Sequence, residues 1–205
     1  MSRRDWDEHY AGGPLPWDTG APDPSLVELL GRLPRGRALE IGCGTGTNAV
    51  YLAGQGYQVV GVDLAPRAVA LARARAAEAG ADVAFHVVDV LADPLPGGPY
   101  DLVFDRGCLH VFDEAADRAR FAEQVASALA PGGQWLSLAG STEGPARDGG
   151  PPRRSAGELV RAIEPHLEIL ELRRATFDLP QGLVAMWICR AGRRAHPAQP
   201  SSRYT

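Results

Sequence analysis

Three alternating glycines, Gly42, Gly44 and Gly46, follow directly on the short apolar run 38–41. Glycine lets the backbone turn sharply at the end of a strand and leaves room for a ligand against the main chain. The next apolar run ends in Asp63, about 20 residues beyond the first glycine, where a carboxylate can accept hydrogen bonds from a ribose. These residues predict a nucleoside site built from a strand, a tight turn and the start of a helix.

The residues beside the glycines indicate which nucleoside would bind. Dinucleotide sites use a G-x-G-x-x-G pattern, and Thr47 stands where the third glycine of that pattern is needed. Glu40 lies two residues before the first glycine, and a carboxylate there attracts a cation and repels a pyrophosphate. S-adenosylmethionine is a nucleoside that carries a sulfonium and an ammonium group. We therefore expect S-adenosylmethionine as the cofactor, rather than a nicotinamide dinucleotide.

With its glycine turn, Glu40 and Asp63, the chain resembles the class I S-adenosylmethionine-dependent methyltransferases over residues 26–190. The resemblance implies that Glu40 and Gly42 line the methionine part of the cofactor. It also implies that Asp63 takes the ribose hydroxyls and that Leu64 packs on the adenine. Taken alone, Asp63 could instead be an ordinary cap of the following helix.

The start of the next helix and the end of the third apolar run complete the expected cofactor site. Backbone donors near Thr47 and Asn48 could hold the cofactor's carboxylate. By the resemblance, Asp89 or its neighbour Val90 meets the adenine amino group, although strand-end acids are also common in surface loops. The residues expected to contact the cofactor are Trp17, Glu40, Gly42, Gly44, Gly46, Thr47, Asn48, Asp63, Leu64, Asp89, Val90 and Asp105.

Two segments concern the methyl acceptor. Residues 14–20 (PLPWDTG) and residues 104–110 (FDRGCLH), after the fourth apolar run, together resemble the thiopurine and thiol S-methyltransferase branch. We expect the proline-stiffened, aromatic residues 1–24 to form an arm that covers the pocket and excludes water. Trp17 could contact the cofactor or only anchor this arm.

The catalytic candidates lie on the turn after the fourth apolar run: Asp105, Arg106 and His110. Arg106 could bind an anionic group of the acceptor, or hold the arm through an acid such as Asp18. Asp105 could orient that arginine or the cofactor. His110 is the candidate general base, and the alternative is a partly buried histidine at a helix edge.

The expected reaction is methyl transfer to a thiol or another chalcogen nucleophile of a small molecule. A thiol is partly ionised at neutral pH, so alignment matters more for its methylation than a base does. One alternative is an O- or N-methyltransferase of a phenolic or heteroaromatic metabolite, for which His110 would matter more. Another is a non-catalytic module that only binds S-adenosylmethionine.

Composition excludes several other classes. The net charge of −4 gives no electrostatic hold on nucleic acid, and the absence of lysine excludes Schiff-base and Walker-lysine chemistry. Three widely spaced cysteines form neither a disulfide framework nor a metal cluster. No apolar run reaches the length of about 18 residues that marks a membrane span, and no signal-peptide core is present. We expect a cytoplasmic protein with a small-molecule substrate and without nucleic-acid, membrane or metal partners; the oligomeric state is not indicated.

Apolar runs and helical segments alternate along the chain, which predicts a doubly wound α/β fold with a mostly parallel sheet. The expected strands are 37–42, 58–63, 83–89, 100–104, 134–139, 166–178 and 183–190, and the expected helices are 26–33, 47–55, 66–79, 114–130 and 155–163. The last two strands have no helix between them, so they predict a C-terminal antiparallel hairpin in a seven-stranded, Rossmann-like sheet. Ligands then bind at the carboxyl ends of the strands.

The expected domain spans residues 25–190. It follows the arm 1–24 and precedes residues 191–205, which we expect to be a disordered tail. Ser25 is expected to cap the first helix of the domain, with Glu28 completing a capping box.

Overall fold

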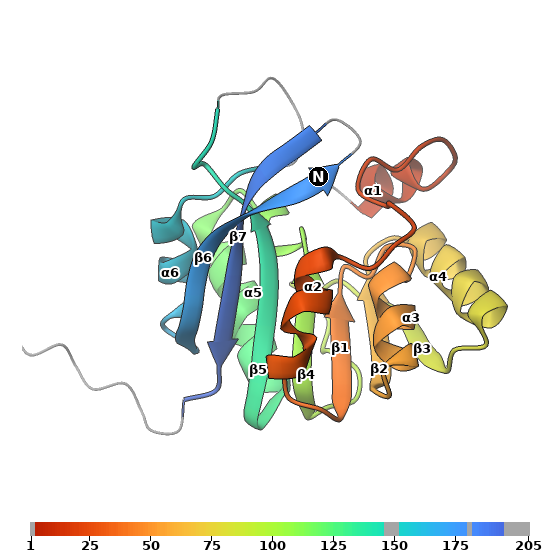
Figure 1. Ribbon diagram of the computed structural model, residues 1–205, viewed down its shortest axis with the longest axis horizontal. Helices are drawn as coiled ribbons and strands as arrows, with labels where there is room; N and C mark the ends of the chain where they lie inside the picture. The colour runs from red at the N-terminus through yellow and green to blue at the C-terminus, as the bar shows by residue number, and fades with distance from the viewer. Residues whose placement is uncertain (1–2, 146–151, 180–181, 195–205) are drawn as a thin grey trace, which may run out of the picture.

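Seven strands form one sheet in the part of the chain that the computed structural model describes, residues 3–145, 152–179 and 182–194. They are β1 (Arg37–Ile41), β2 (Gln58–Asp63), β3 (Val83–Val87), β4 (Tyr100–Arg106), β5 (Leu129–Gly140), β6 (Glu168–Leu179) and β7 (Gly182–Gly192). Their order is β3-β2-β1-β4-β5-β7-β6, and β7 is antiparallel to both of its neighbours (Figure 1). The predicted fold, a mostly parallel sheet with a C-terminal antiparallel hairpin, is confirmed.

Helices cover both faces of this sheet. They are α1 (Arg3–His9), α2 (Pro24–Leu29), α3 (Thr47–Gly54), α4 (Pro66–Ala79), α5 (Ala115–Ala128) and α6 (Ala156–Ile163), with 3₁₀ turns η1 (Leu30–Arg32) and η2 (Leu109–Val111). Side chains of α2, α3 and α4 share one core cluster with the sheet, while those of α5 and α6 share the other. The helix α1 lies within the predicted arm and was not expected as a helix.

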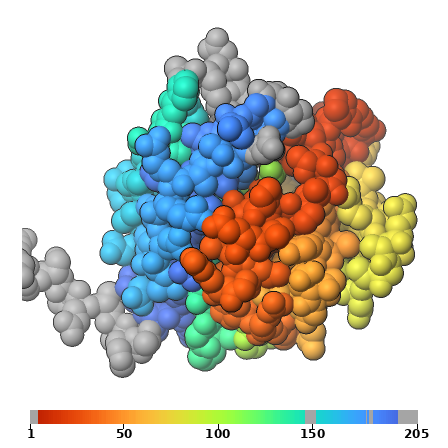
Figure 2. Space-filling view, in the orientation of Figure 1, coloured from red at the N-terminus to blue at the C-terminus, as the bar shows by residue number. Residues whose placement is uncertain are grey.

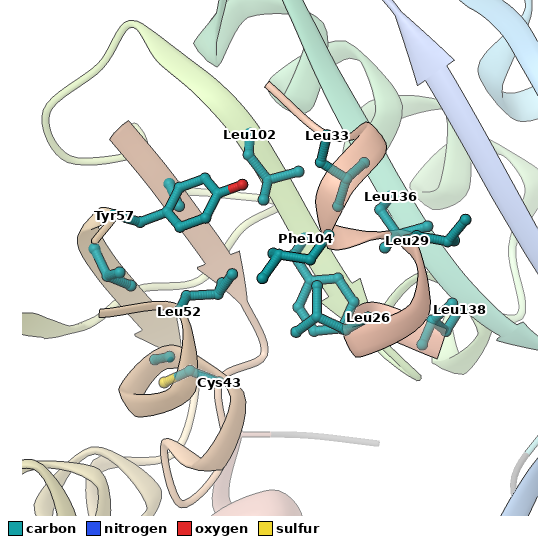
Figure 3. Close-up of a cluster of buried hydrophobic side chains, with 14 of the residues drawn as sticks. Leu26, Leu29, Leu33, Cys43, Leu52, Tyr57, Leu102, Phe104, Leu136 and Leu138 are labelled. Carbon is teal, nitrogen blue, oxygen red and sulfur yellow. The ribbon is translucent and has the colours of Figure 1, made fainter. Parts of the chain in front are cut away.

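Alternation along the central strands divides the core between the two faces. Leu102 and Phe104 of β4 point to one face, and Val103 between them points to the other. Figure 3 shows Leu26 and Leu29 of α2 packed against the first of these faces. Both leucines are fully buried, so the segment that follows the arm is held firmly on the sheet.

The start of α2 differs from the prediction. The helix begins at Pro24, and its cap is Asp23, whose Oδ1 accepts from the N–H of Ser25 at 2.9 Å. The predicted cap by Ser25, with Glu28 in a capping box, is therefore wrong. The physical reason is that proline suits the first helical position, so an aspartate directly before it becomes the better cap.

The ends of the chain also differ from the prediction in one respect. The strand β7 continues to Gly192, past the expected domain end at residue 190, because its last residues still pair with β5 and β6. Most of the predicted tail, residues 195–205, lies outside the described residues. No helix in the described part of the chain has the length and apolar character needed to cross a membrane.

Candidate functional site

A cavity of about 1740 Å³ opens at the carboxyl ends of the central strands. Its walls come from the arm, the glycine turn, the ends of β2 and β3, the turn after β4 and the β6–β7 hairpin. Predicted site residues that line it are Trp17, Glu40, Gly42, Gly44, Thr47, Asn48, Asp63, Leu64, Asp89, Val90, Arg106 and His110. The structure thus brings most of the predicted residues together around one space, while Gly46 and Asp105 do not line it.

The glycine turn has the backbone that its sequence predicts. Gly42, Gly44 and Gly46 all adopt positive φ angles, of 70°, 53° and 81°. A Cβ at Gly46 would lie 2.9 Å from the Cβ of Ala72, so this glycine allows α3 and α4 to pack closely. Gly42 likewise allows the turn after β4 to approach, because a Cβ there would lie 3.0 Å from the side chain of Cys108.

Asp63 is held in place at the end of β2. Its Oδ2 accepts from the N–H of Gly44 and its Oδ1 from the N–H of Ala65, each at 2.9 Å. Burial raises the pKa of this carboxyl, and the backbone donors act in the opposite direction. The result is a carboxylate fixed beside the glycine turn, with capacity left to accept from a ligand's hydroxyl groups.

Glu40 is a buried acid whose second oxygen has no partner. Its side chain is 1% exposed, Oε1 accepts from Nδ2 of Asn48 at 3.2 Å, and Oε2 has no hydrogen-bond partner in the described structure. Burial raises the pKa of Glu40 to about 8, and the Asn48 donor lowers it in part. An unpaired carboxyl oxygen at a cavity wall suits a cationic group, so this donor set fits the ammonium group of S-adenosylmethionine.

Glu40 predicts a pH dependence of cofactor binding. Below a pKa of about 8 the group is mainly protonated and neutral, so affinity for the ammonium group is expected to rise as the pH increases from about 6 to 8. Calorimetric titration with S-adenosylhomocysteine, which keeps that ammonium group, measures this slope. The Glu40→Gln variant is expected to bind weakly with no slope over this range. The same slope in the variant would assign the titration to another group, such as Asp63.

Asp18 fastens the arm to the start of α3. Its carboxylate accepts from Oγ1 of Thr45 at 2.5 Å and from Oγ1 of Thr47 at 3.1 Å, and it pairs with Arg75 of α4 at 3.0 Å. Asn48 also contacts the arm, since its Oδ1 accepts from the N–H of Asp23 at 2.9 Å. The side chains of Thr47 and Asn48 therefore contact the arm, and their roles toward the cofactor stay predictions.

Arg106 joins three parts of the molecule. Its Nε donates to Oδ2 of Asp23 at 2.6 Å and its Nη1 to the carbonyl of Trp17 at 3.0 Å. Its guanidinium also lies 4.9 Å from the ring centre of Phe177 on β6. The expected anchoring of the arm by Arg106 is present, but the acid is Asp23 and not Asp18.

Aromatic side chains of the arm lie over the glycine turn. The ring of Trp17 lies 6.2 Å from that of Trp6 and 6.0 Å from that of Tyr10. A Cβ at Gly44 would stand 3.2 Å from the Tyr10 hydroxyl, so this ring reaches the glycine turn itself. Burial raises the pKa of Tyr10 far above its usual range, so the phenol stays neutral.

Asp105 lies behind the cavity and shapes the turn after β4. It is fully buried and accepts from the Trp135 indole at 2.9 Å, and from the N–H groups of Cys108 and Leu109 at 3.1 and 3.0 Å. Burial raises its pKa, and these donors counteract that effect. In the described part of the chain no hydrogen bond joins Asp105 to Arg106, so the position of Asp105 supports a structural role.

His110 is buried at the cavity wall, with a side chain 3% exposed. Its Nδ1 accepts from the N–H of Gly140 at 2.5 Å. A neutral imidazole that accepts at Nδ1 carries its proton on Nε2. In this tautomer the ring can donate a hydrogen bond from Nε2 and cannot take a proton there.

Sequence reasoning missed Asp23 and Phe177, the two side chains that contact Arg106. A signal existed for Asp23, because an aspartate before proline and a helical segment is typical of a helix cap. No local pattern marks Phe177, which lies 71 residues after Arg106 in the chain. Its place depends on the hairpin folding back over the cavity.

Comparisons with known proteins agree with this geometry. A family model described as a methyltransferase domain matches residues 38–133. The probable thiol methyltransferase 2 of Arabidopsis thaliana is 32% identical over 164 residues, which cover 78% of this chain and 71% of that protein. The 2-heptyl-1-hydroxyquinolin-4(1H)-one methyltransferase of Mycobacteroides abscessus is 34% identical over 134 residues, covering 64% of this chain and 58% of the relative.

A solved structure extends the similarity to nearly the whole chain. It comes from work on the conversion of a disulfide bond into a thioacetal group during echinomycin biosynthesis. Its TM-score to this chain is 0.84 at 30% sequence identity, and the match covers 94% of this chain and 92% of that one. The match therefore includes the arm and the hairpin as well as the central sheet.

Proposed function

Because this chain belongs to the class I S-adenosylmethionine-dependent methyltransferases, we propose that it methylates the sulfur of a small-molecule thiol. The enzyme class and the cofactor are those of the family. The choice of sulfur rests mainly on His110, whose Nδ1 is occupied by the N–H of Gly140. A histidine in that state is a poor general base, and a thiol has the least need of one.

The relatives support sulfur as the acceptor atom without excluding others. The Arabidopsis protein is named a probable thiol methyltransferase, and the solved structure described above comes from work on the conversion of a disulfide bond into a thioacetal group. The Mycobacteroides relative is named for a hydroxyquinolinone, which favours an oxygen acceptor as the second candidate.

We propose that the cofactor residues act as the sequence predicts: Glu40 at the ammonium group, Asp63 at the ribose and Asp89 or Val90 at the adenine. S-adenosylmethionine supplies an electrophilic methyl group on its sulfonium sulfur. The arm, held by Arg106 and Asp18, would keep water out of the cavity and hold the thiol in line with that methyl group. A free thiol with a pKa near 8.5 is a few per cent ionised at neutral pH, which suffices for attack once it is aligned.

The first test is turnover of methyl-labelled S-adenosylmethionine against aryl thiols, alkyl thiols and sulfide, beside matched phenols and N-hydroxy heteroaromatics. We expect label in the thiols alone. Faster methylation of an oxygen acceptor would overturn the proposal in favour of the second candidate. Cofactor binding without turnover on any member would favour a binding module.

Replacing His110 with alanine separates the two acceptor classes. We expect kcat for thiols to change only a few-fold, while the free energy of unfolding falls by about 1–3 kcal/mol because the N–H of Gly140 loses its acceptor. The matched control is His9→Ala, since His9 also lines the cavity but is exposed on the arm. A loss of about a hundredfold or more in kcat from His110→Ala, with activity kept in His9→Ala, would identify His110 as a general base and contradict the thiol proposal.

A further inference from the structure

The β6–β7 hairpin extends beyond the sheet at the end where the cavity opens. The strand β5 pairs with β7 only as far as Gly140 opposite Met186, whereas β6 and β7 continue to pair until Leu179 opposite Gly182. Residues 176–179 and 182–185 therefore form an overhang above the edge of the sheet. Figure 1 shows this hairpin extending past the end of β5 toward the N-terminal arm.

The overhang is apolar where it faces the cavity. Cavity-lining residues from it are Thr176, Phe177, Leu179, Leu183, Val184 and Ala185. Leu183, Val184 and Ala185 are consecutive in a strand, so both faces of the hairpin tip contribute to the wall. The opposite wall carries the polar residues Glu40, Asp63 and Asp89. The overhang thus adds an apolar surface to a cavity whose remaining lining includes both charged and apolar side chains.

The volume exceeds what the cofactor alone requires. A pocket for one drug-sized ligand encloses about 300–1,000 Å³, and this cavity encloses about 1740 Å³. Space for a second molecule of similar size therefore remains next to the apolar wall. In Figure 2 the N-terminal segment, in red to orange, lies beside the blue strands of the hairpin, and residues of both segments line the cavity.

One leucine on the overhang is left largely uncovered by the described part of the chain. Leu183 is 72% exposed, the highest value among the exposed large apolar side chains of the described chain. Leu170, on β6 at the other end of the same hairpin, is 43% exposed and does not line the cavity. An exposed leucine at the wall of a ligand cavity is explained if a ligand covers it.

We infer that the acceptor has a bulky apolar body, aromatic or branched alkyl, which packs on the overhang, and that Leu183 helps to select it. The identity of the reacting atom as sulfur rests on the proposed function, whereas the apolar body rests on the hairpin. A small polar thiol would leave the overhang uncovered. A large apolar one would bury Leu183 and Val184 against its own surface.

The test compares Leu183→Asp with Leu170→Asp, which introduces the same charge on the same hairpin away from the cavity. Protein loaded with S-adenosylhomocysteine is titrated with naphthalene-2-thiol, 2-naphthol and 2-mercaptoethanol. We expect Leu183→Asp to weaken binding of both naphthalene compounds about five- to tenfold and to leave 2-mercaptoethanol unchanged. With S-adenosylmethionine present, the KM of any methylated naphthalene compound should rise while kcat stays within two- to threefold. Leu170→Asp should behave like the unaltered protein.

The outcomes separate this inference from the proposed function. Binding of both naphthalene compounds that depends on Leu183, with methylation of naphthol only, would retain the apolar site and overturn the thiol proposal. Equal affinity of the Leu183→Asp and Leu170→Asp variants for the naphthalene compounds would overturn the inference. Tighter binding of 2-mercaptoethanol than of either aromatic compound would also overturn it, even if thiol methylation were rapid.

Discussion

Replacing Arg106 with alanine is expected to lower methyl transfer by at least about a hundredfold and to release the N-terminal arm. The ion pair between Arg106 and Asp23 is nearly buried, with side chains 16% and 3% exposed. Removing one partner of such a pair costs about 3–5 kcal/mol, because the other charge stays buried without compensation. The same substitution also removes the contacts of the guanidinium with the Trp17 carbonyl and with the ring of Phe177.

Turnover and the chymotrypsin sensitivity of Trp6, Tyr10 and Trp17 measure this effect. The matched control is Arg75→Ala, which removes another charged contact of the arm, the pair with Asp18; that pair is more exposed, so its loss should cost no more than about 1 kcal/mol. The Arg106→Lys variant should recover little turnover, since lysine lacks the planar guanidinium that donates to both Asp23 and the Trp17 carbonyl. A protected arm combined with lost turnover in Arg106→Ala would instead support direct binding of the acceptor by Arg106.

Replacing Asp63 with alanine is expected to weaken binding of S-adenosylhomocysteine about a hundredfold or more, a loss of a few kcal/mol. The two oxygens of Asp63 are held by the N–H groups of Gly44 and Ala65, so the carboxylate is already in position before a ligand arrives. Calorimetry on the full chain measures the loss. Unchanged affinity would refute the assignment of Asp63 to the ribose.

Asp63→Asn is the informative companion variant. It keeps an oxygen for one backbone donor but removes the negative charge, so the turn should remain folded while affinity falls by a smaller factor. Asp89→Ala should have a weaker effect than Asp63→Ala, because Oδ1 of Asp89 mainly accepts from the N–H of Leu91 within its own turn. If the thermal unfolding temperature of the free protein fell as much in Asp63→Asn as in Asp63→Ala, the role of Asp63 would be structural.

The positions of the residues proposed to bind the cofactor could be predicted because their determinants are local in sequence. The glycine turn, Glu40 and Asp63 all fall within two adjacent strand-turn units, where spacing along the chain translates directly into position at the sheet edge. The sheet itself was predictable for the same reason, since each apolar run and helix repeats one pattern. The helix cap at Asp23 was misjudged because two possible caps stand two residues apart around a proline.

The acceptor half could not be predicted in the same detail, because its contacts join distant parts of the chain. Arg106 meets Asp23 and Phe177 only after the arm and the hairpin have folded back over the sheet. The tautomer of His110 likewise depends on the N–H of Gly140, at the far end of β5. The side-chain types identified these residues as candidates. Their contact partners decide whether each side chain binds a ligand, donates a hydrogen bond or only supports the fold.

The meeting of arm and hairpin at Arg106 has a consequence for how such an enzyme changes over evolutionary time. Most of the residues proposed to bind the cofactor lie within one continuous stretch of the chain, from Glu40 to Val90, whereas the arm and the β6–β7 hairpin supply walls of the proposed acceptor site. Exposed loops and hairpin tips tolerate insertions and exchanges better than the elements they connect. Acceptor preference can therefore diverge through the arm and the hairpin while the cofactor residues are inherited intact, and Asp23 and Phe177 mark the contacts that each new arm and hairpin must satisfy.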